Sequence, residues 1–121
     1  MENKFLFDTY ALIEISKGNP NYERYVDKGI IINNFIFAEY CYYLVKKSVP
    51  NKNQKATILE NSIIHANPEI LKKAMRFRYK NRKKKLSMAD CISYIMSLKL
   101  GIKFLTGDKE FKDMENVEFV K

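Results

Sequence analysis

The chain has 121 residues, of which 46% are hydrophobic, and it carries a net charge of +8. This size and composition fit one folded domain over residues 1–121 and exclude a disordered or fibrous protein. No apolar run reaches the length that a transmembrane helix needs, so we expect no membrane-spanning segment.

The start of the chain, MENKFLFDTY, has an early acid and an apolar stretch too short for a signal peptide, so we expect a cytoplasmic protein. Cys41 and Cys91 each lie in an apolar helical pattern, and a reducing cytosol favours two buried free thiols. With His65 they cannot supply the four ligands of a structural zinc site, and no acid or serine motif beside His65 indicates a role for it.

The expected elements alternate between strands and helices. Residues 4–7 predict a short buried strand, residues 9–17 a helix that ends at Gly18, and residues 21–28 a second short helix that ends at Gly29. The β-branched run at 30–32 predicts a strand. Asn34 is expected to cap a helix over 35–47.

In the second half, helices are predicted over 51–64, 69–80 and 88–100, the last capped by Ser87 and stopped by Gly101. Residues 103–106 predict a strand, 108–113 a helical turn and 117–120 a final strand. This alternation indicates an α/β fold whose parallel sheet is covered by helices on both faces.

The positive charge is concentrated in residues 72–85, KKAMRFRYKNRKKK, called the basic segment below. It holds nine of the 22 basic residues and no acid, so the rest of the chain is nearly neutral. Such a segment attracts phosphate chains, and Phe77 and Tyr79 offer rings on which bases can stack. A solvated, lysine-rich helix face and loop remains the alternative.

Three acids have apolar neighbours. Asp8 lies between FLF and TYALI, Glu39 is the only charge in the stretch 35–45, and Asp90 is the only charge between Leu86 and Leu98. A buried carboxylate is costly unless a cation, a metal or several hydrogen bonds compensate it.

Asp108 joins these acids because of its position. It follows the strand at 103–106 through one glycine, as Asp8 follows the strand at 4–7. Ligands of parallel α/β sheets bind at the carboxyl ends of strands. Four acids there would form an all-oxygen pocket suited to Mg²⁺ or Mn²⁺ and, without a metal, would repel one another and hold protons.

Each acid also has a structural alternative. Asp8 and Asp108 could cap the helical segments that follow them, and Ser87 with Asp90 resembles a capping box. Glu39 could pair with a basic side chain across the core. Capping leaves Glu39 unexplained.

The segments FLFDTYALIE, NFIFAEYCYYL, LSMADCISYIMSLKLGIKFLTGDKEF and VEFV resemble, in this order, those of the PIN-domain nucleases, especially VapC-like toxins of toxin–antitoxin pairs. The resemblance covers nearly the whole chain, and its third segment is the most specific. It implies a single PIN-like domain, with a central parallel sheet of four or five short strands flanked by helices and one or two divalent metal ions.

The resemblance also implies site residues. Asp8, Glu39, Asp90 and Asp108 match the acidic quartet of the family, with Thr106 and Thr9 as hydroxyl residues beside it. Asp8, Asp90 and Asp108 would hold the metal directly or through water, and Glu39 would either bind it or orient the attacking water. Asp113 has no counterpart and is interpreted as a surface acid.

We therefore expect a metal-dependent endoribonuclease, the toxin of a toxin–antitoxin pair, with an antitoxin partner and a homodimeric state. The dense basic segment departs from the family pattern. Its expected RNA contacts are Lys72, Lys73, Arg76, Arg78, Arg82, Lys83, Lys84 and Lys85. The alternatives are a non-catalytic RNA-binding or assembly module with the same fold, and a DNA or structure-specific nuclease, for whose arch or clamp the chain has little room.

Overall fold

All strands of the fold pair in parallel. β1 (Phe5–Phe7), β4 (Lys103–Thr106) and β5 (Val117–Phe119) form a sheet in the order β1-β4-β5, and β2 (Ile32–Asn33) pairs with β3 (Ile63–Ile64). A parallel bridge between Leu6 and Ile31 connects the two sheets. The computed structural model describes residues 4–121, so the predicted parallel sheet is confirmed there, divided into three strands and two.

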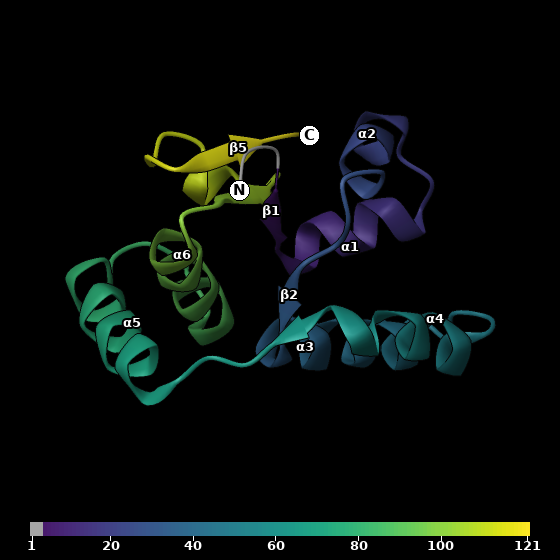
Figure 1. The fold of residues 1–121 in the computed structure, drawn as a ribbon, viewed down its shortest axis with the longest axis horizontal. Helices are drawn as coiled ribbons and strands as arrows, with labels where there is room; N and C mark the ends of the chain where they lie inside the picture. Colours follow the sequence, from purple (N-terminus) through teal and green to yellow (C-terminus); the bar gives the residue numbers. More distant parts are fainter. Residues whose placement is uncertain (1–3) are drawn as a thin grey trace.

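Helices cover both faces of the larger sheet (Figure 1). α1 (Thr9–Ser16) contacts β1 and β4 from one side, and α6 (Met88–Leu100) contacts them from the other. α2 (Glu23–Val26) lies beside α1, and α5 (Pro68–Lys80) packs on α6. α3 (Asn34–Lys46) and α4 (Lys52–Leu59) lie together beside β2 and β3 (Figure 1). Three short 3₁₀ segments complete the described chain: η1 (Pro20–Tyr22), η2 (Glu60–Ser62) and η3 (Lys109–Phe111).

β1 is a continuous apolar run because both of its faces are buried, as is the Phe104–Leu105 stretch of β4. Leu6 and Phe7 are fully buried, and Phe7 pairs with Leu105 of β4. On the α6 side, Phe104 and Phe111 pack edge to face with ring centroids 5.0 Å apart. This packing fixes the strand ends that carry the candidate site.

Two predicted helices are partly wrong. The helix expected over 21–28 divides into η1 and α2 and ends at Val26. The helix expected over 51–64 ends at Leu59, continues as η2 and gives way to β3. The β-branched pair Ile63–Ile64 extends to pair with β2, so tertiary pairing overrides the local helical pattern.

The starts of α3, α4 and α5 are each shifted by one residue from the prediction, and α4 begins at Lys52. Asn33, not Asn34, caps α3: its Oδ1 accepts a hydrogen bond from the Ile36 amide at 2.8 Å. The Nδ2 of Asn33 donates to Ser93 Oγ on α6 at 3.0 Å, so this buried cap also ties α3 to α6. Pro68 is the first residue of α5 and Asn67 caps it, since a helix tolerates proline in its first turn.

The two cysteines are free thiols, as predicted. Cys91 is fully buried in α6, where burial raises the pKa of its thiol to about 11, and Cys41 is half-buried in α3. Within residues 4–121, no helix combines the length and apolar character that a membrane crossing requires.

Candidate metal centre

Three of the four predicted acids lie at the starts of helical segments beside one edge of the sheet. Asp8 follows β1 directly and is the N-cap of α1, and Asp108 lies two residues beyond β4 and is the N-cap of η3. Because β1 and β4 are parallel and in register, their carboxyl ends meet at one edge, called the carboxyl edge below. Asp90 lies in the first turn of α6, which packs on both strands.

Asp8 is the most buried of these acids, with 3% of its surface exposed. Its Oδ1 accepts from the Ala11 amide at 2.8 Å, and its Oδ2 accepts from Thr106 Oγ1 at 2.5 Å. Burial raises the pKa of Asp8 to about 7, and the negative charges of Asp90 and Asp108 add to the rise, while the two hydrogen bonds oppose it. The buried carboxyl group therefore holds its proton to a higher pH than an exposed aspartate does.

Asp90 is held by a complete capping box. Its Oδ2 accepts from the Ser87 amide at 2.9 Å, and its own amide donates to Ser87 Oγ at 3.0 Å. Burial raises the pKa of Asp90, the negative charges of Glu39 and Asp108 raise it further, and the bonds to Ser87 lower it. These mutual effects indicate that the four carboxylates share one electrostatic environment.

Thr106 links two of the acids. Its Oγ1 donates to Asp8 Oδ2 and accepts from the Asp108 amide at 3.0 Å. Gly107 stands between Thr106 and Asp108 in a place with no room for a side chain, because a Cβ atom there would lie 2.3 Å from both a Tyr10 ring carbon and the Val120 carbonyl oxygen. The sequence Thr-Gly-Asp thus folds tightly against α1 and the end of β5.

Glu39 lies on α3, away from any helix start. Its Oε1 accepts from Thr9 Oγ1 at 2.6 Å, so the first turn of α1 orients it. Thr9 and Glu39 also line an open cavity of about 440 Å³ with Ile13, Ala38 and two tyrosines. Glu39 is therefore the acid of the centre that faces an opening in the surface.

The negative charge of this centre has no basic partner among the described residues. The ion pairs found in residues 4–121 involve Glu14, Glu69 and Glu118, and none involves the four acids. The expected alternative of an ion pair for Glu39 is thus not found there, and Thr9 is its hydrogen-bond partner.

The donor set fits a hard divalent cation. All four groups are carboxylates, and Asp8 keeps lone pairs beyond the two that its hydrogen bonds use. In residues 4–121, no three acidic, histidine or cysteine side chains are arranged to enclose an ion as they stand, so binding would require carboxylates to turn. A cation would relieve the burial and repulsion that raise the pKa values of Asp8 and Asp90.

The helix-capping alternatives describe the same side chains correctly. Asp8, Asp90 and Asp108 all accept hydrogen bonds from the amides at the starts of helical segments. Capping and metal binding are compatible, because the caps aim the carboxylates and leave acceptor positions open. Glu39 has no capping role, which leaves its place beside the other acids without a purely structural explanation.

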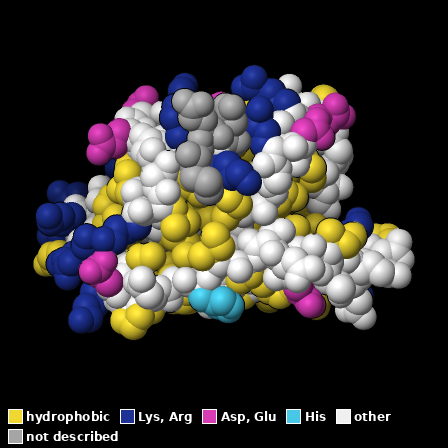
Figure 2. Space-filling model, viewed as in Figure 1, with side chains coloured by type: hydrophobic (Ala, Val, Ile, Leu, Met, Phe, Trp, Pro, Cys, Tyr) yellow, Lys and Arg dark blue, Asp and Glu magenta, His cyan; other side chains and the backbone are white. Residues whose placement is uncertain are grey.

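The last part of the basic segment lies close to the centre in the fold. The segment forms α5 from Lys72 onward and the turn before Ser87, where Lys84 Nζ donates to the Glu110 carbonyl oxygen at 3.3 Å. Glu110 is two residues beyond Asp108, so the turn meets η3 beside the acids. Lys and Arg side chains cover the α5 side of the molecule in Figure 2. All eight predicted RNA contacts are exposed: Lys72, Lys73, Arg76, Arg78, Arg82, Lys83, Lys84 and Lys85.

The aromatic residues of the basic segment differ from the prediction. Phe77 is half-buried against Tyr94, with ring centroids 5.1 Å apart, and is not a surface on which bases can stack. Tyr79 is 67% exposed, but the Arg82 guanidinium lies 4.1 Å from its ring centroid and occupies one face. Binding by charge is therefore better supported than binding by stacking.

Sequence analysis did not single out Gly107 or Tyr10. The sequence feature that could have indicated Gly107 is a glycine that stands between Thr106 and Asp108 just after a strand. Glycines at such positions often allow another part of the backbone to approach closely. Thr9 and Thr106, which were singled out, both hydrogen-bond acids of the centre.

The sequence matches the family described as PIN domain over residues 5–117, and the chain belongs to that family. A comparison with curated proteins gives no match. Among solved structures, the chain is similar to VapC20 of Mycobacterium tuberculosis, a sarcin-ricin loop cleaving toxin, with a TM-score of 0.80, 16% identity and 97% of each chain covered.

Two toxin–antitoxin structures have the same fold. One is a complex from Klebsiella pneumoniae, with a TM-score of 0.76, 19% identity and coverage of 95% of this chain and 96% of the other. The other is VapBC2 of Rickettsia felis bound to a DNA fragment from its promoter, with a TM-score of 0.70, 18% identity and coverage of 96% of each chain.

Proposed function

We propose that this protein is a metal-dependent endoribonuclease that hydrolyses RNA phosphodiester bonds as the toxin of a toxin–antitoxin pair. The observation that carries this proposal is the group of four carboxylates at the carboxyl edge, which pair with no cation in residues 4–121 and which include one buried acid with a pKa of about 7. Membership of the PIN domain family and the similarity to VapC structures support it.

In this mechanism Asp8, Asp90 and Asp108 would hold Mg²⁺ or Mn²⁺, directly or through water. A divalent ion bound there would supply an acidified water molecule and positive charge to balance that of the attacked phosphate. Thr106 keeps Asp8 oriented through its hydroxyl donor, and the capping box fixes one carboxylate oxygen of Asp90.

Glu39 either binds the ion or orients the attacking water. Its contact with Thr9 fixes one carboxylate oxygen and leaves the other available, and its position beside an open cavity gives it access to solvent. Both roles use the carboxylate of Glu39.

The basic segment binds the RNA backbone beside the acids. Lys84 reaches η3, so the turn at 81–85 brings several cations close to the centre without pairing with it. This arrangement separates two tasks, since the acids perform the chemistry and the exposed cations hold the phosphates on either side of the cut.

An antitoxin partner and a homodimer belong to the same proposal. The toxin–antitoxin structures similar to this chain support the first, and the family resemblance implies the second. Of the tyrosine-rich segment 40–43, Tyr40 is buried and Tyr42 is 67% exposed, so Tyr42 is the residue of that segment available to a partner surface.

The test is cleavage of a cellular RNA pool by the purified protein, with Mg²⁺, with Mn²⁺, with EDTA, and with Asp8→Asn protein. We expect discrete products that require metal and that the variant does not form. RNA binding without cleavage by the wild-type protein would instead support a non-catalytic RNA-binding module, and cleavage confined to DNA would indicate a DNA nuclease.

Replacing Lys83, Lys84 and Lys85 by Gln tests the role of the basic segment. Loss of these charges should weaken RNA binding about tenfold and lower the slope of log K against log salt by about 2. The matched control replaces Lys46, Lys47 and Lys52, which are exposed at the far end of the α3–α4 pair. Equal RNA binding by both variants would indicate that the basic segment is a solvated surface with no role in RNA binding.

A further inference from the structure

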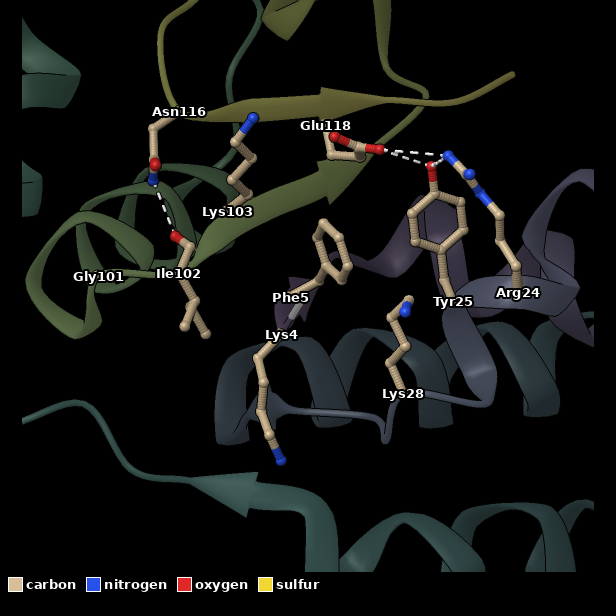
Figure 3. A pocket seen from close by; sticks show the side chains of 10 residues that line it. All are labelled: Lys4, Phe5, Arg24, Tyr25, Lys28, Gly101, Ile102, Lys103, Asn116 and Glu118. Atoms are coloured by element: carbon tan, nitrogen blue, oxygen red, sulfur yellow. Dashed lines mark hydrogen bonds and ion pairs between the residues drawn. The ribbon is translucent and has the colours of Figure 1, made fainter. Parts of the chain in front are cut away.

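A second concave site lies at the opposite edge of the sheet, where β1 and β4 begin and where β5 starts. It is a cavity of about 520 Å³ that includes Phe5, Lys103 and Asn116 in its lining (Figure 3). This amino edge is separated from the four acids by the length of the strands. The cavity has the volume typical of small-ligand pockets.

The lining of the cavity is strongly cationic. Lys4, Arg24, Lys28 and Lys103 line it, and Glu118 is the single acid that does so among the described residues. In Figure 3, Arg24 and Lys28 lie on one side of Phe5, and Lys103 lies on the other. These cations come from three separate parts of the chain and are outside the basic segment, so the fold has brought them together.

The single acid is already engaged. Glu118 Oε2 accepts from the Tyr25 hydroxyl at 2.6 Å and lies 3.6 Å from Arg24 Nη2. Within residues 4–121 the three lysines take part in no ion pair, so their charge remains available to a ligand. All three are exposed, and their flexible stems can converge on an anion without large desolvation of the bound pair.

The aromatic residues of the lining do not offer stacking faces. Phe5 and Tyr25 are 8% and 3% exposed and pack edge to face, with ring centroids 5.1 Å apart. The Arg24 guanidinium lies 4.7 Å from the Tyr25 ring centroid and covers that ring further. The cavity therefore suits a compact, highly charged anion and not a nucleobase.

We propose that this cavity binds phosphate groups, as an anion site separate from the acidic centre. Three lysine ammonium groups are strongly hydrated point charges that bind phosphate oxygens from any direction, whereas a planar carboxylate is better matched by a free guanidinium. The phosphates of a free oligophosphate and of a nucleic-acid backbone share this chemistry, and the experiment below separates the two sources.

The experiment is a titration of the ¹⁵N-labelled full chain with inorganic tripolyphosphate, followed by amide chemical shifts. The expected result is a saturable change at Phe5, Ile102, Lys103 and Asn116, distinct from any change along 72–85. The variant with Lys4, Lys28 and Lys103 replaced by Gln should bind at this site at least about tenfold more weakly. The control with Lys46, Lys47 and Lys52 replaced by Gln carries the same charge change and should bind as the wild type does.

Replacing Glu118 should strengthen tripolyphosphate binding, whereas replacing the lysines should weaken it. Glu118→Gln keeps an acceptor for Tyr25 and removes the only negative charge that the described residues contribute to the lining, so it should tighten tripolyphosphate binding about threefold. Changes confined to the basic segment, or equal binding by the pocket variant and its control, would overturn the proposal.

Two further ligands test whether the bound phosphates belong to a free oligophosphate or to a nucleic-acid backbone. A short RNA without terminal phosphates, added to Asp8→Asn protein to prevent cleavage, should compete with tripolyphosphate at the cavity if the source is a nucleic-acid backbone. Failure to compete, with tripolyphosphate still bound, assigns the site to free oligophosphates. Equal binding of a polyglutamate peptide at the same ionic strength would contradict the phosphate assignment. The proposed nuclease activity does not enter these readouts, so the two proposals can fail independently.

Discussion

The two edges of the parallel sheet differ in charge and in how tightly their side chains are fixed. At the carboxyl edge, Asp8, Asp90 and Asp108 are held by amides and hydroxyls and have no cationic partner in the described chain. At the amino edge, the lysines of the cavity are exposed and bound to few other groups. The side chains of the first edge are therefore held by hydrogen bonds and are electrostatically unfavourable, as in catalytic sites, whereas those of the second are adaptable.

The largest expected effect is on activity at the carboxyl edge. Glu39→Gln preserves the acceptor for Thr9 and removes only the charge, so we expect RNA cleavage to fall on the order of 10³-fold with the melting temperature unchanged. The exposed Glu60 of η2 provides the matched control, and Glu60→Gln should cleave normally. Full activity of Glu39→Gln would remove Glu39 from the mechanism.

The second prediction concerns pH and stability without metal. The folded-state pKa of Asp8 is raised from 3.8 to about 7, so in this range the folded protein holds a proton that the unfolded chain has released. Its contribution lowers the free energy of unfolding as pH rises from 4 to 7, by at most about 4 kcal/mol, and is constant above the folded-state pKa. Chemical denaturation of wild-type and Asp8→Asn proteins in EDTA measures the difference between them.

The free energy of unfolding of Asp8→Asn, relative to that of the wild type, should rise between pH 4 and pH 7, because asparagine carries no charge to bury. Mg²⁺ should narrow the difference between the two proteins again at pH 7 by stabilising only the wild-type protein. A variant that is less stable than the wild type by the same amount at every pH would indicate that the hydrogen bonds of Asp8, and not its charge, dominate.

Gly107→Ala should have an intermediate effect. The added Cβ would press on Tyr10 and on the Val120 carbonyl, so we expect destabilisation of about 1–3 kcal/mol and a loss of cleavage as Asp108 is displaced. Thermal unfolding and RNA cleavage measure the two effects. In a Tyr10→Ala background the substitution should cost less, because one of the two close contacts is gone, and an equal cost in both backgrounds would assign the strain to Val120 alone.

The smallest expected effects come from two serine substitutions in and beside α6, one near each edge of the sheet. Ser87→Ala removes one hydroxyl hydrogen bond of α6 at the carboxyl edge and should cost about 1 kcal/mol. Ser97→Ala removes two at the amino edge, one to the Tyr94 carbonyl and one from Asn116, and should cost about 2 kcal/mol. Only Ser87→Ala should lower cleavage, by about tenfold, because it loosens the first turn of α6 that carries Asp90, although the Ser87 amide that binds the Asp90 carboxylate remains. Equal activities of the two variants would show that the Ser87 hydroxyl does not position the acid.

Much of this arrangement was predictable from the sequence. The apolar runs at 5–7 and 103–106 each end just before an acid, so the carboxyl edge followed from strand order alone. The starts of α1 and α6 were equally clear, because Asp8 and Ser87 precede apolar helical patterns. Strand ends and helix starts depend on residues that are close together in the sequence, so the local pattern is enough to predict them.

The amino-edge cavity could not be predicted, because Lys4, Arg24 and Lys103 are far apart in sequence and each resembles an ordinary surface cation. The strand at Ile63–Ile64 was missed for a related reason, since its pairing with β2 decides its conformation. Phe77 was assigned to the surface because charged neighbours surround it, although the helical repeat turns it toward Tyr94.

The double role of the capping acids affects how relatives of this protein should be compared. Losing the hydrogen-bonding side chain at position 8, 90 or 108 would weaken a helix start, so selection for folding alone would keep a capping side chain at each position, with Asn as acceptable as Asp at position 8. Glu39 supports no helix start and would drift once catalysis ceased. Among homologous sequences, the residue at this position should therefore separate active from inactive members better than the presence of a capping side chain at the other three positions does.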